Sequence, residues 1–362
     1  MAAFILNSYM IKISLNFGSK NYDINIGKGI LQKRIFDKSI RYAIITDSNV
    51  RKLCGESLQN LLKKQGADVA MLDFPAGEES KTRETKALLE DKLFEMNYDA
   101  DSMIIALGGG VVGDIAGFVA ATYLRGVSYM QIPTTLLAMV DSSIGGKVGI
   151  NVDKGENVIG TFYQPKGVII DIETLKTLPR KEMLNGLSEI IKCSMVRSYN
   201  FFEYLEKGIG RSDDNFYLYS IERCCRLKAR IVELDEKELE FRKILNYGHI
   251  IGHAIEANEK YKISHGEAVA VGMAYEGLIS FQLGLLKKED LERQNALISR
   301  VGFPTRYEGD VSKLIEVMKH DKKRKDKKIH FVLPKTIGEV IEENGHVTLA
   351  VDETLVRECL NN

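Results

Sequence analysis

The order of apolar segments along the chain constrains the fold more than any other feature of the sequence. Segments with the composition of buried strands lie at 41–47, 67–73 and 102–107, and segments with helical periodicity lie between them at 57–66 and 80–97. Strands that alternate with helices form βαβ units, and successive units build a largely parallel sheet. The first half of the chain is therefore predicted to be an α/β domain.

Beyond Pro179 the strand signals almost disappear. Helical spacing follows at 181–199, 217–234, 245–258 and 267–283, and only 328–333 and 339–341 suggest extended chain. We therefore predict two domains: residues 1–179 form the α/β domain, and residues 180–362 form an all-helical domain. A chain of 362 residues is long enough for each domain to bury its own core.

The overall charge balance argues against several classes of partner. Lys and Arg together number 50, as do Asp and Glu, so the formal net charge is zero. A nucleic-acid-binding surface needs a basic excess, and the one dense basic run, at 322–328, is interpreted as a solvated loop from which a ligand could recruit a lysine. No apolar run is long enough to span a bilayer. Five cysteines without CxxC spacing are typical of reduced thiols in a cytoplasmic protein.

A glycine-rich sequence follows the third predicted strand. Leu107-Gly-Gly-Gly-Val-Val-Gly-Asp114 fits the pattern G-x-G-x-x-G and precedes a predicted helix at 115–122. Such a turn lets the backbone approach a pyrophosphate at a helix N-terminus, which indicates a dinucleotide site in a Rossmann-like domain. The alternative is a tight turn whose glycines serve packing alone. Because Asp47 ends an earlier strand, a bound dinucleotide would not follow the standard first-unit arrangement.

Two further polar loops are candidates for ligand binding. Gly77-Glu-Glu-Ser-Lys81 could contact the same ligand, or Ser80 could simply cap the next helix. Asp141-Ser-Ser-Ile-Gly-Gly-Lys147 combines small residues, backbone N–H groups and a lysine, which is typical of an anion site. An exposed Gly/Ser loop is the alternative there, but the density of small polar residues favours the anion site.

Three of the six histidines lie within 17 residues, at His249, His253 and His265. His249 and His253 are four residues apart, so on a helix they share one face. Imidazoles on an apolar helix indicate a metal, an anion or proton transfer, although a pair with this spacing is more often capped or at the surface. Ser264 and Glu267 fit a capping box that would hold His265 at a rigid helix start. A catalytic zinc site needs three protein ligands, and the third is not evident from this segment alone.

Eight motifs together make the chain resemble the 3-dehydroquinate synthase family, from about Asp47 to Gly338. Their order along the chain is more specific than any single motif. They lie at 108–114, 121–126, 133–137, 141–149, 185–192, 245–249, 252–256 and 264–267.

The resemblance implies a lyase of the shikimate pathway that converts 3-deoxy-D-arabino-heptulosonate 7-phosphate to 3-dehydroquinate and phosphate. The implied sequence is transfer of a hydride from the C5 hydroxyl to NAD⁺, elimination of phosphate, return of the hydride, ring opening and aldol closure. The rival enzymes are sister sugar-phosphate cyclases, whose substrates lack a carboxylate, and a metal-dependent polyol dehydrogenase, which would release NADH. A non-catalytic metal- or nucleotide-binding protein is a rival of a different class.

The resemblance also implies roles for individual residues. Glu189, His249 and His265 would bind a divalent metal, usually zinc, with cobalt as the alternative. The residues implied to contact NAD⁺ are Asp47, Asn49, Glu78, Lys81, Gly109, Gly110, Val111, Asp114, Thr134, Thr135, Asp141, Ser142 and Lys147. The residues implied to contact the phosphorylated sugar acid or to transfer protons are Lys147, Asn157, Lys192, Lys228, Arg242, Asn246, His253 and one lysine of Lys322 and Lys323.

Two further expectations come from the resemblance. Arg125 would reach the active site of the partner subunit, which implies a homodimer. In contrast, Glu156 stands in a Gly-Glu-Asn run where the family usually has Gly-Lys-Asn. A glutamate reverses the local charge where anions are expected, so we assign no binding role to Glu156.

Overall fold

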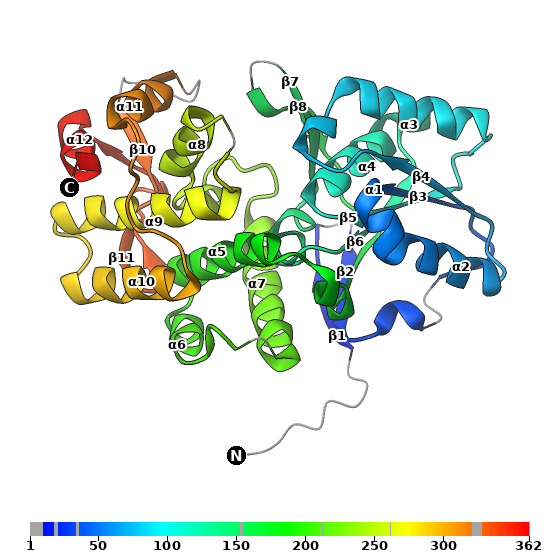
Figure 1. Cartoon of the computed structure of the whole chain (residues 1–362), viewed down its shortest axis with the longest axis horizontal. Helices are drawn as coiled ribbons and strands as arrows, with labels where there is room; N and C mark the ends of the chain where they lie inside the picture. The colour runs from blue at the N-terminus through cyan, green and yellow to red at the C-terminus, as the bar shows by residue number, and fades with distance from the viewer. Residues whose placement is uncertain are drawn as a thin grey trace, which may run out of the picture. The chain divides into compact units, whose positions relative to one another are not determined.

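The computed structural model describes residues 10–17, 21–33, 36–152, 155–211, 213–260, 262–320 and 328–361. The chain divides into two compact units (Figure 1). The first comprises Met1–Pro179 and Tyr217–Ala229, and the second comprises Arg180–Phe216 and Arg230–Asn362. The change at Pro179 is thus one boundary, but a stretch of the predicted second domain groups with the first unit.

A seven-stranded sheet forms the centre of the first unit, in the order β1-β2-β9-β6-β5-β3-β4. Its strands are β1 (Ile11–Leu15), β2 (Tyr22–Gly27), β3 (Tyr42–Asp47), β4 (Val69–Phe74), β5 (Met103–Gly108), β6 (Ser128–Pro133) and β9 (Gly167–Asp171). Only β1 runs antiparallel to its neighbour. From β3 the chain moves outward to β4 and then returns to the other side of β3 as β5. Open α/β sheets bind ligands at such a switch point, outside the carboxyl ends of the strands.

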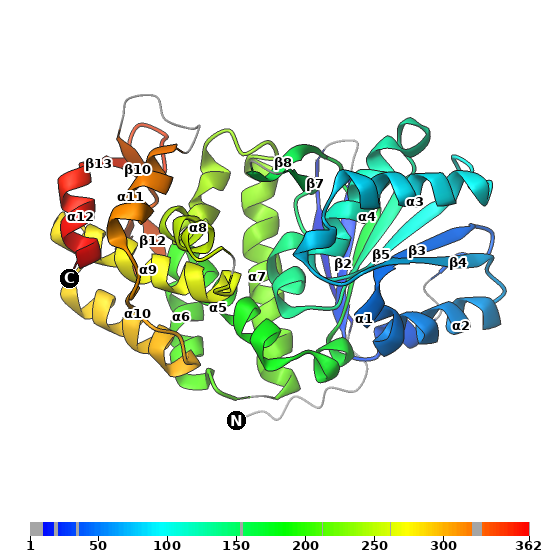
Figure 2. The same cartoon turned by 45° about the horizontal axis from the view of Figure 1, so that its top comes forward.

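Helices cover both faces of this sheet, as β3 illustrates. Ala43 and Ile45 pack in one apolar core with the helices α3 and α4, and Tyr42 and Ile44 pack in another with α2. These helices are α2 (Glu56–Lys64), α3 (Arg83–Glu95) and α4 (Gly110–Thr122). Successive strand residues point to opposite faces, so an apolar strand needs cover on both sides. Figure 2 shows α2 on one face and α3 and α4 on the other, which confirms the predicted α/β class.

The first unit also contains shorter elements. Among them are α1 (Ser48–Val50), the 3₁₀ turn η4 (Tyr123–Arg125), the π-helical turn η5 (Ala138–Ser142), and the antiparallel hairpin of β7 (Lys147–Val152) and β8 (Gly155–Phe162). The helix α7 (Asp214–Leu234) contributes its middle, Tyr217–Ala229, to this unit.

The second unit is mostly helical. Its helices are α5 (Arg180–Arg197), α6 (Tyr199–Gly208), α8 (His249–Asn258), α9 (His265–Gln282), α10 (Lys288–Val301), α11 (Val311–His320) and α12 (Glu353–Asn361). Its strands form two short antiparallel pairs, β10 (Ile329–Phe331) with β13 (Leu349–Val351) and β11 (Pro334–Thr336) with β12 (Glu339–Val340). Apolar side chains of α8, α9, α11, α12 and β10 share one core. Within the described ranges, no helix is both long and apolar enough to cross a membrane.

Candidate active site

Two helices of the second unit, α8 and α9, carry the three clustered histidines. They approach so closely that a Cβ atom on Gly272 would lie 1.9 Å from the carbonyl oxygen of Gly248. Gly248 itself has φ +79°, and a Cβ there would lie 2.7 Å from the carbonyl oxygen of Val269. Gly248 thus has a left-handed conformation, which favours glycine. It separates α8 from the preceding 3₁₀ turn η7 (Phe241–Asn246). The helix therefore begins at His249, four residues later than the sequence predicted.

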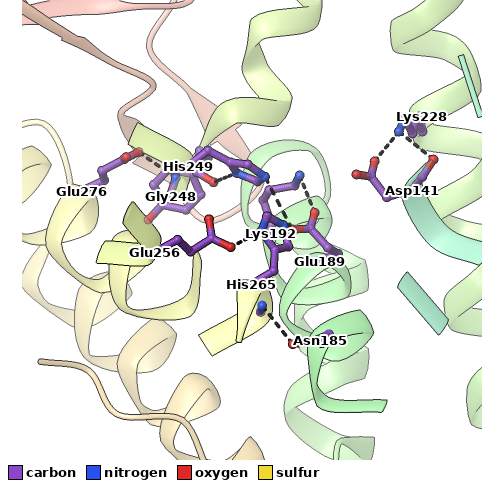
Figure 3. Close-up of polar contacts among 12 residues, drawn as sticks. Asp141, Asn185, Glu189, Lys192, Lys228, Gly248, His249, Glu256, His265 and Glu276 are labelled. Carbon is purple, nitrogen blue, oxygen red and sulfur yellow. Dashed lines mark hydrogen bonds and ion pairs between the residues drawn. The ribbon is translucent and has the colours of Figure 1, made fainter. Parts of the chain in front are cut away.

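His249 and His265 both face Glu189 of α5 (Figure 3). The Oε1 atom of Glu189 lies 3.7 Å from Nε2 of His249 and 3.6 Å from Nε2 of His265. These distances are too long for hydrogen bonds, and this Oε1 has no hydrogen-bond partner among the described residues. Ligand atoms of the three residues lie within 4.8 Å of one another. One buried carboxylate oxygen facing two imidazole nitrogens fits a divalent cation such as zinc.

The charge state of Glu189 also suits a cation. Its side chain is 2% exposed, and it forms an ion pair with Lys192, one turn later on α5. Burial alone would raise the pKa of Glu189, but Lys192 and the two histidines hold that pKa well below its ordinary value. The group is therefore a carboxylate, which is the form that binds a metal.

The second ring nitrogen of each histidine is also fixed. In His249, Nδ1 lies 3.1 Å from the carbonyl oxygen of Tyr247, so Nδ1 carries the proton and Nε2 presents its lone pair. Burial, with Lys192 nearby, holds the pKa of His249 well below its ordinary value, so this ring is neutral.

In His265, Nδ1 lies 3.1 Å from Oε1 of Glu256. Burial opposes a charge on His265, but Glu189 and Glu256 raise its pKa to about 10. A cation at this site would therefore displace a proton from His265 as it binds.

The start of α9 is anchored to α5. Ser264 caps α9 through its side chain, as predicted, so His265 is the first helical residue. Asn185, one turn before Glu189 on α5, accepts a hydrogen bond from the N–H of Gly266 at 3.0 Å. This contact fixes the position of Glu189 on α5 relative to His265 on α9, two of the three candidate ligands.

His253 lies one turn after His249 and outside the Glu189 group. Its ring centroid is 5.3 Å from that of His249 and 6.2 Å from that of His265. His253, Glu256 and His265 form a second group of converging ligand atoms. However, the two groups share His265, whose Nδ1 already faces the Glu256 carboxylate, so the Glu189 group is the better candidate for a metal site.

The glycine-rich turn of the first unit joins β5 to α4, as predicted. Gly109 is the N-cap of α4, and among the described residues no side chain caps this end. A Cβ on Gly109 would lie 3.0 Å from Cγ2 of Thr135, and one on Gly110 would lie 3.3 Å from Oγ of Ser142. A helix N-terminus without a side-chain cap, next to the switch point of the sheet, fits a pyrophosphate.

Other glycines of the same turn serve packing. A Cβ on Gly108 would lie 2.5 Å from Val112, and one on Gly113 would lie 2.8 Å from Gln131. Close packing therefore accounts for Gly108 and Gly113, whereas Gly109 and Gly110 combine close packing with a place at the start of α4.

Lys81, which is buried, and Asp114, which is partly buried, form an ion pair beside this turn. Nζ of Lys81 lies 2.5 Å from Oδ2 of Asp114 and 3.8 Å from Oε1 of Glu78. Burial would lower the pKa of Lys81, but the two carboxylates hold it above its ordinary value. The alternative role given to Ser80 is wrong: Thr82 caps α3, and Ser80 donates to the carbonyl of Pro75 instead.

Asp141 and Lys228 are also brought together within the first unit (Figure 3). Nζ of Lys228 donates to the carbonyl oxygen of Asp141 at 2.7 Å and forms an ion pair with its carboxylate. The two residues belong to different predicted domains, and the contact lies in the part of α7 that groups with the sheet.

The other predicted residues have diverse surroundings. The Asp47 carboxylate caps α1 by accepting the N–H of Asn49 at 2.8 Å. Arg242 is 2% exposed and donates to the carbonyl of Glu236 at 2.8 Å.

Five more of the residues predicted to contact NAD⁺ or substrate lie among the described residues. Val111 lies in the first turn of α4, Thr134 donates its N–H to Gly108, Lys147 begins β7, Asn157 donates its N–H to Asn151, and Asn246 donates to Glu238. Lys322 and Lys323 lie outside the described residues.

Sequence reasoning assigned no role to Glu256 or Asn185. The available signal for Glu256 was its spacing, since it lies two turns after His249 on the same helix and ends the motif that contains His253. Asn185 begins the motif that contains Glu189, one turn before it.

The fold and the site define a class of proteins in which an α/β unit precedes a helical unit, and whose solved members include sugar-phosphate cyclases. A structure of 2-deoxy-scyllo-inosose synthase complexed with carbaglucose-6-phosphate, NAD⁺ and Co²⁺ is 27% identical, with a TM-score of 0.87, over 97% of this chain and 99% of that one. The 2-epi-5-epi-valiolone synthase from Streptomyces hygroscopicus subsp. jinggangensis, with NAD⁺ and Zn²⁺ bound, is 26% identical, with a TM-score of 0.86, over 98% of both chains.

Sequence comparison identifies the family within this class. The 3-dehydroquinate synthase N-terminal model matches residues 71–185, and the C-terminal model matches residues 186–324. The 3-dehydroquinate synthase from Caldanaerobacter subterraneus subsp. tengcongensis is 50% identical over 312 residues, which are 84% of this chain and 86% of that protein. The chain belongs to the 3-dehydroquinate synthase family, which confirms the resemblance carried by the eight motifs.

Proposed function

We propose that the protein converts 3-deoxy-D-arabino-heptulosonate 7-phosphate to 3-dehydroquinate and inorganic phosphate. Membership of the family supports this reaction, and the solved relatives that contain NAD⁺ with Co²⁺ or Zn²⁺ support the cofactors. The observation that carries the proposal is the buried Glu189 oxygen, without a hydrogen bond among the described residues, that faces Nε2 of His249 and of His265.

These three residues are the proposed metal ligands. The proposed NAD⁺ contacts follow the carboxyl ends of β3, β4, β5 and β6, and Asp47, Gly109 and Gly110 stand at or just after the ends of β3 and β5, the two strands at the switch point. When bound, NAD⁺ takes up and returns a hydride, and the divalent ion polarises hydroxyl oxygens of the substrate. The N-terminus of α4 and the Lys81 ammonium provide positive charge for the pyrophosphate.

The remaining proposed roles follow from the charges of the substrate, which carries a carboxylate and a phosphate. The cations proposed to bind these groups are Lys147, Lys192, Lys228, Arg242 and one lysine of Lys322 and Lys323, with the amides of Asn157 and Asn246. Arg242 suits a carboxylate because its planar guanidinium can donate two parallel hydrogen bonds. His253, exposed and outside the metal group, is proposed to contact the phosphate and to transfer protons.

We further propose a homodimer in which Arg125 reaches the site of the partner subunit. Leu124 and Arg125 adopt consecutive left-handed conformations, with φ of 48° and 65°. Such strain costs about 1–3 kcal/mol for each non-glycine residue and is concentrated at functional sites. Leu124 is also 46% exposed, so burial of its side chain does not account for the strain. Mixing inactive Arg125→Ala with inactive Lys192→Ala should restore activity if sites are shared, whereas no recovery in mixed dimers would contradict the proposal.

A cytoplasmic location is proposed because all five cysteines, each among the described residues, are thiols.

Substrate choice tests the proposed reaction against its nearest rival. Purified protein with NAD⁺ and Zn²⁺ or Co²⁺ is incubated either with the heptulosonate phosphate or with heptulose and hexose phosphates that lack a carboxylate. We expect phosphate release from the heptulosonate and its loss in Arg242→Ala. Faster release from a substrate without a carboxylate would instead identify a sister cyclase.

A further inference from the structure

The helix α9 carries a buried carboxyl group that the proposed function does not use. Glu276 is 0% exposed, and no cation is paired with it within the part of the chain that the structure describes. Its Oε2 accepts a hydrogen bond from the N–H of Gly248 at 2.8 Å, and its Oε1 has no hydrogen-bond partner among the described residues. Burial raises the pKa of Glu276 well above its ordinary value. Burying such a group is costly, so its presence in an apolar helix requires an explanation.

The position of its partner supplies that explanation. Gly248 is the N-cap of α8, and His249 follows it directly. The first N–H groups of a helix have no partner inside the helix, so a buried helix start needs an acceptor from elsewhere. Glu276 provides one for Gly248. Against the larger effect of burial, the backbone N–H groups of Gly248, Ile251 and Ile250 lower the pKa of this carboxyl group. The carboxyl group therefore lies against the first turn of α8.

The backbone at the start of α8 also determines where the imidazole of His249 points. Its Nδ1 is held by the carbonyl of Tyr247, and the next residue, Gly248, is held by Glu276. Both anchors are backbone groups immediately before His249, so a shift at the start of α8 moves its Nε2 relative to Glu189. A misplaced ligand weakens metal binding even when all three ligands are present.

We propose that Glu276 is a positioning residue of the metal site, which holds the first turn of α8 so that His249 faces Glu189 and His265. This inference rests on the metal site of the proposed function. Glu276 itself is not one of the three proposed ligands.

Another residue of α9 offers a matched control. Ser280 lies one turn after Glu276, is also 0% exposed, and donates a hydrogen bond to the carbonyl of Pro334. Pro334 belongs to β11 and not to α8. Ser280→Ala therefore removes a buried polar contact from the same helix without altering the start of α8.

The experiment measures metal binding without substrate. Zn²⁺ affinity is obtained by competition with a chromophoric chelator, and ligand geometry is followed by the visible absorption of bound Co²⁺. Glu276→Ala should weaken Zn²⁺ binding about 10- to 100-fold and alter the Co²⁺ spectrum. Glu276→Gln retains an acceptor oxygen and should recover most of the affinity, while Ser280→Ala should bind both ions as the unaltered protein does. If the alanine variant does not fold, Glu276→Met fills a similar volume without an acceptor and takes its place.

Two outcomes would overturn this inference but leave the proposed metal site intact. One is an unchanged affinity and spectrum in Glu276→Ala or Glu276→Met. The other is a loss of affinity in Ser280→Ala as large as that in Glu276→Ala. An unaltered protein that binds neither ion would overturn the metal site of the proposed function, and this inference with it.

Discussion

Replacing Gly272 with alanine tests how closely α8 and α9 must approach. In an unconstrained helix interior, Gly→Ala stabilises a protein by about 0.5–1 kcal/mol. Here the added Cβ would lie 1.9 Å from the carbonyl oxygen of Gly248 and 3.0 Å from the nitrogen of Gly252. Both are backbone atoms, so the helices must separate by about 1 Å or more to reach ordinary contact distance. Such overpacking costs about 1–3 kcal/mol, and the upper end applies because the contacts are to backbone atoms; subtracting the gain in helix propensity leaves a net loss of about 2 kcal/mol.

The measurement is urea unfolding of the metal-free protein, followed by far-ultraviolet circular dichroism. The control is Gly55→Ala, because Gly55 has helical φ and ψ and its new Cβ would meet only the flexible end of Met71, at 3.4 Å, and the carbonyl of Val50, at 3.5 Å. The control should be neutral or stabilising by up to about 1 kcal/mol. Gly272→Ala should also weaken Zn²⁺ binding, because the new Cβ would displace Gly248 and with it the adjacent His249. A Gly272→Ala protein as stable as the unaltered protein would refute the reasoning.

Three further predictions concern single side chains. Lys81→Met should destabilise the protein by about 2 kcal/mol in urea unfolding, because the partly buried Asp114 loses its cation; the double variant with Asp114→Asn should recover most of this, and no recovery would contradict the pairing. Asp235 accepts three backbone N–H groups that, against the effect of burial, lower its pKa. Its stabilisation is therefore present above the unfolded-state pKa and lost as the pH falls through the lower folded-state value. The difference in urea midpoint between Asp235→Asn and the unaltered protein should accordingly shrink from pH 7 to pH 3, and a constant difference would count against it. Glu256→Ala should weaken Zn²⁺ binding about 10- to 100-fold in chelator competition, since His265 loses the partner of its Nδ1, and an unchanged affinity would argue against that role.

The fold was predictable where strands and helices alternate locally. The strands β3, β4 and β5 are short apolar runs between amphipathic helices, and each lies within two residues of its predicted position. By contrast, β9 was not predicted, because three consecutive aliphatic residues between a glycine and an aspartate do not distinguish a strand from a buried helix. Its place between β2 and β6 depends on pairing between distant segments, for which the local sequence carries no signal.

The candidate site was predictable in composition but not in geometry. The family resemblance implied Glu189 as a partner for His249 and His265, and the structure brings the three together. Nothing in the local sequence placed Lys228 beside Asp141, since 87 residues separate them. Glu276 was also missed, because only the packing of α9 against the start of α8 gives its carboxyl group a partner.

The most direct test of the central claim is the stoichiometry of phosphate and NADH in one reaction. Purified protein is given excess heptulosonate phosphate, a divalent metal and a limiting amount of NAD⁺, and both products are quantified over time. A cyclase that recycles its cofactor should release many equivalents of phosphate per NAD⁺ without net accumulation of NADH. NADH that accumulates in step with substrate oxidation, with no phosphate released, would instead identify a dehydrogenase and contradict the account.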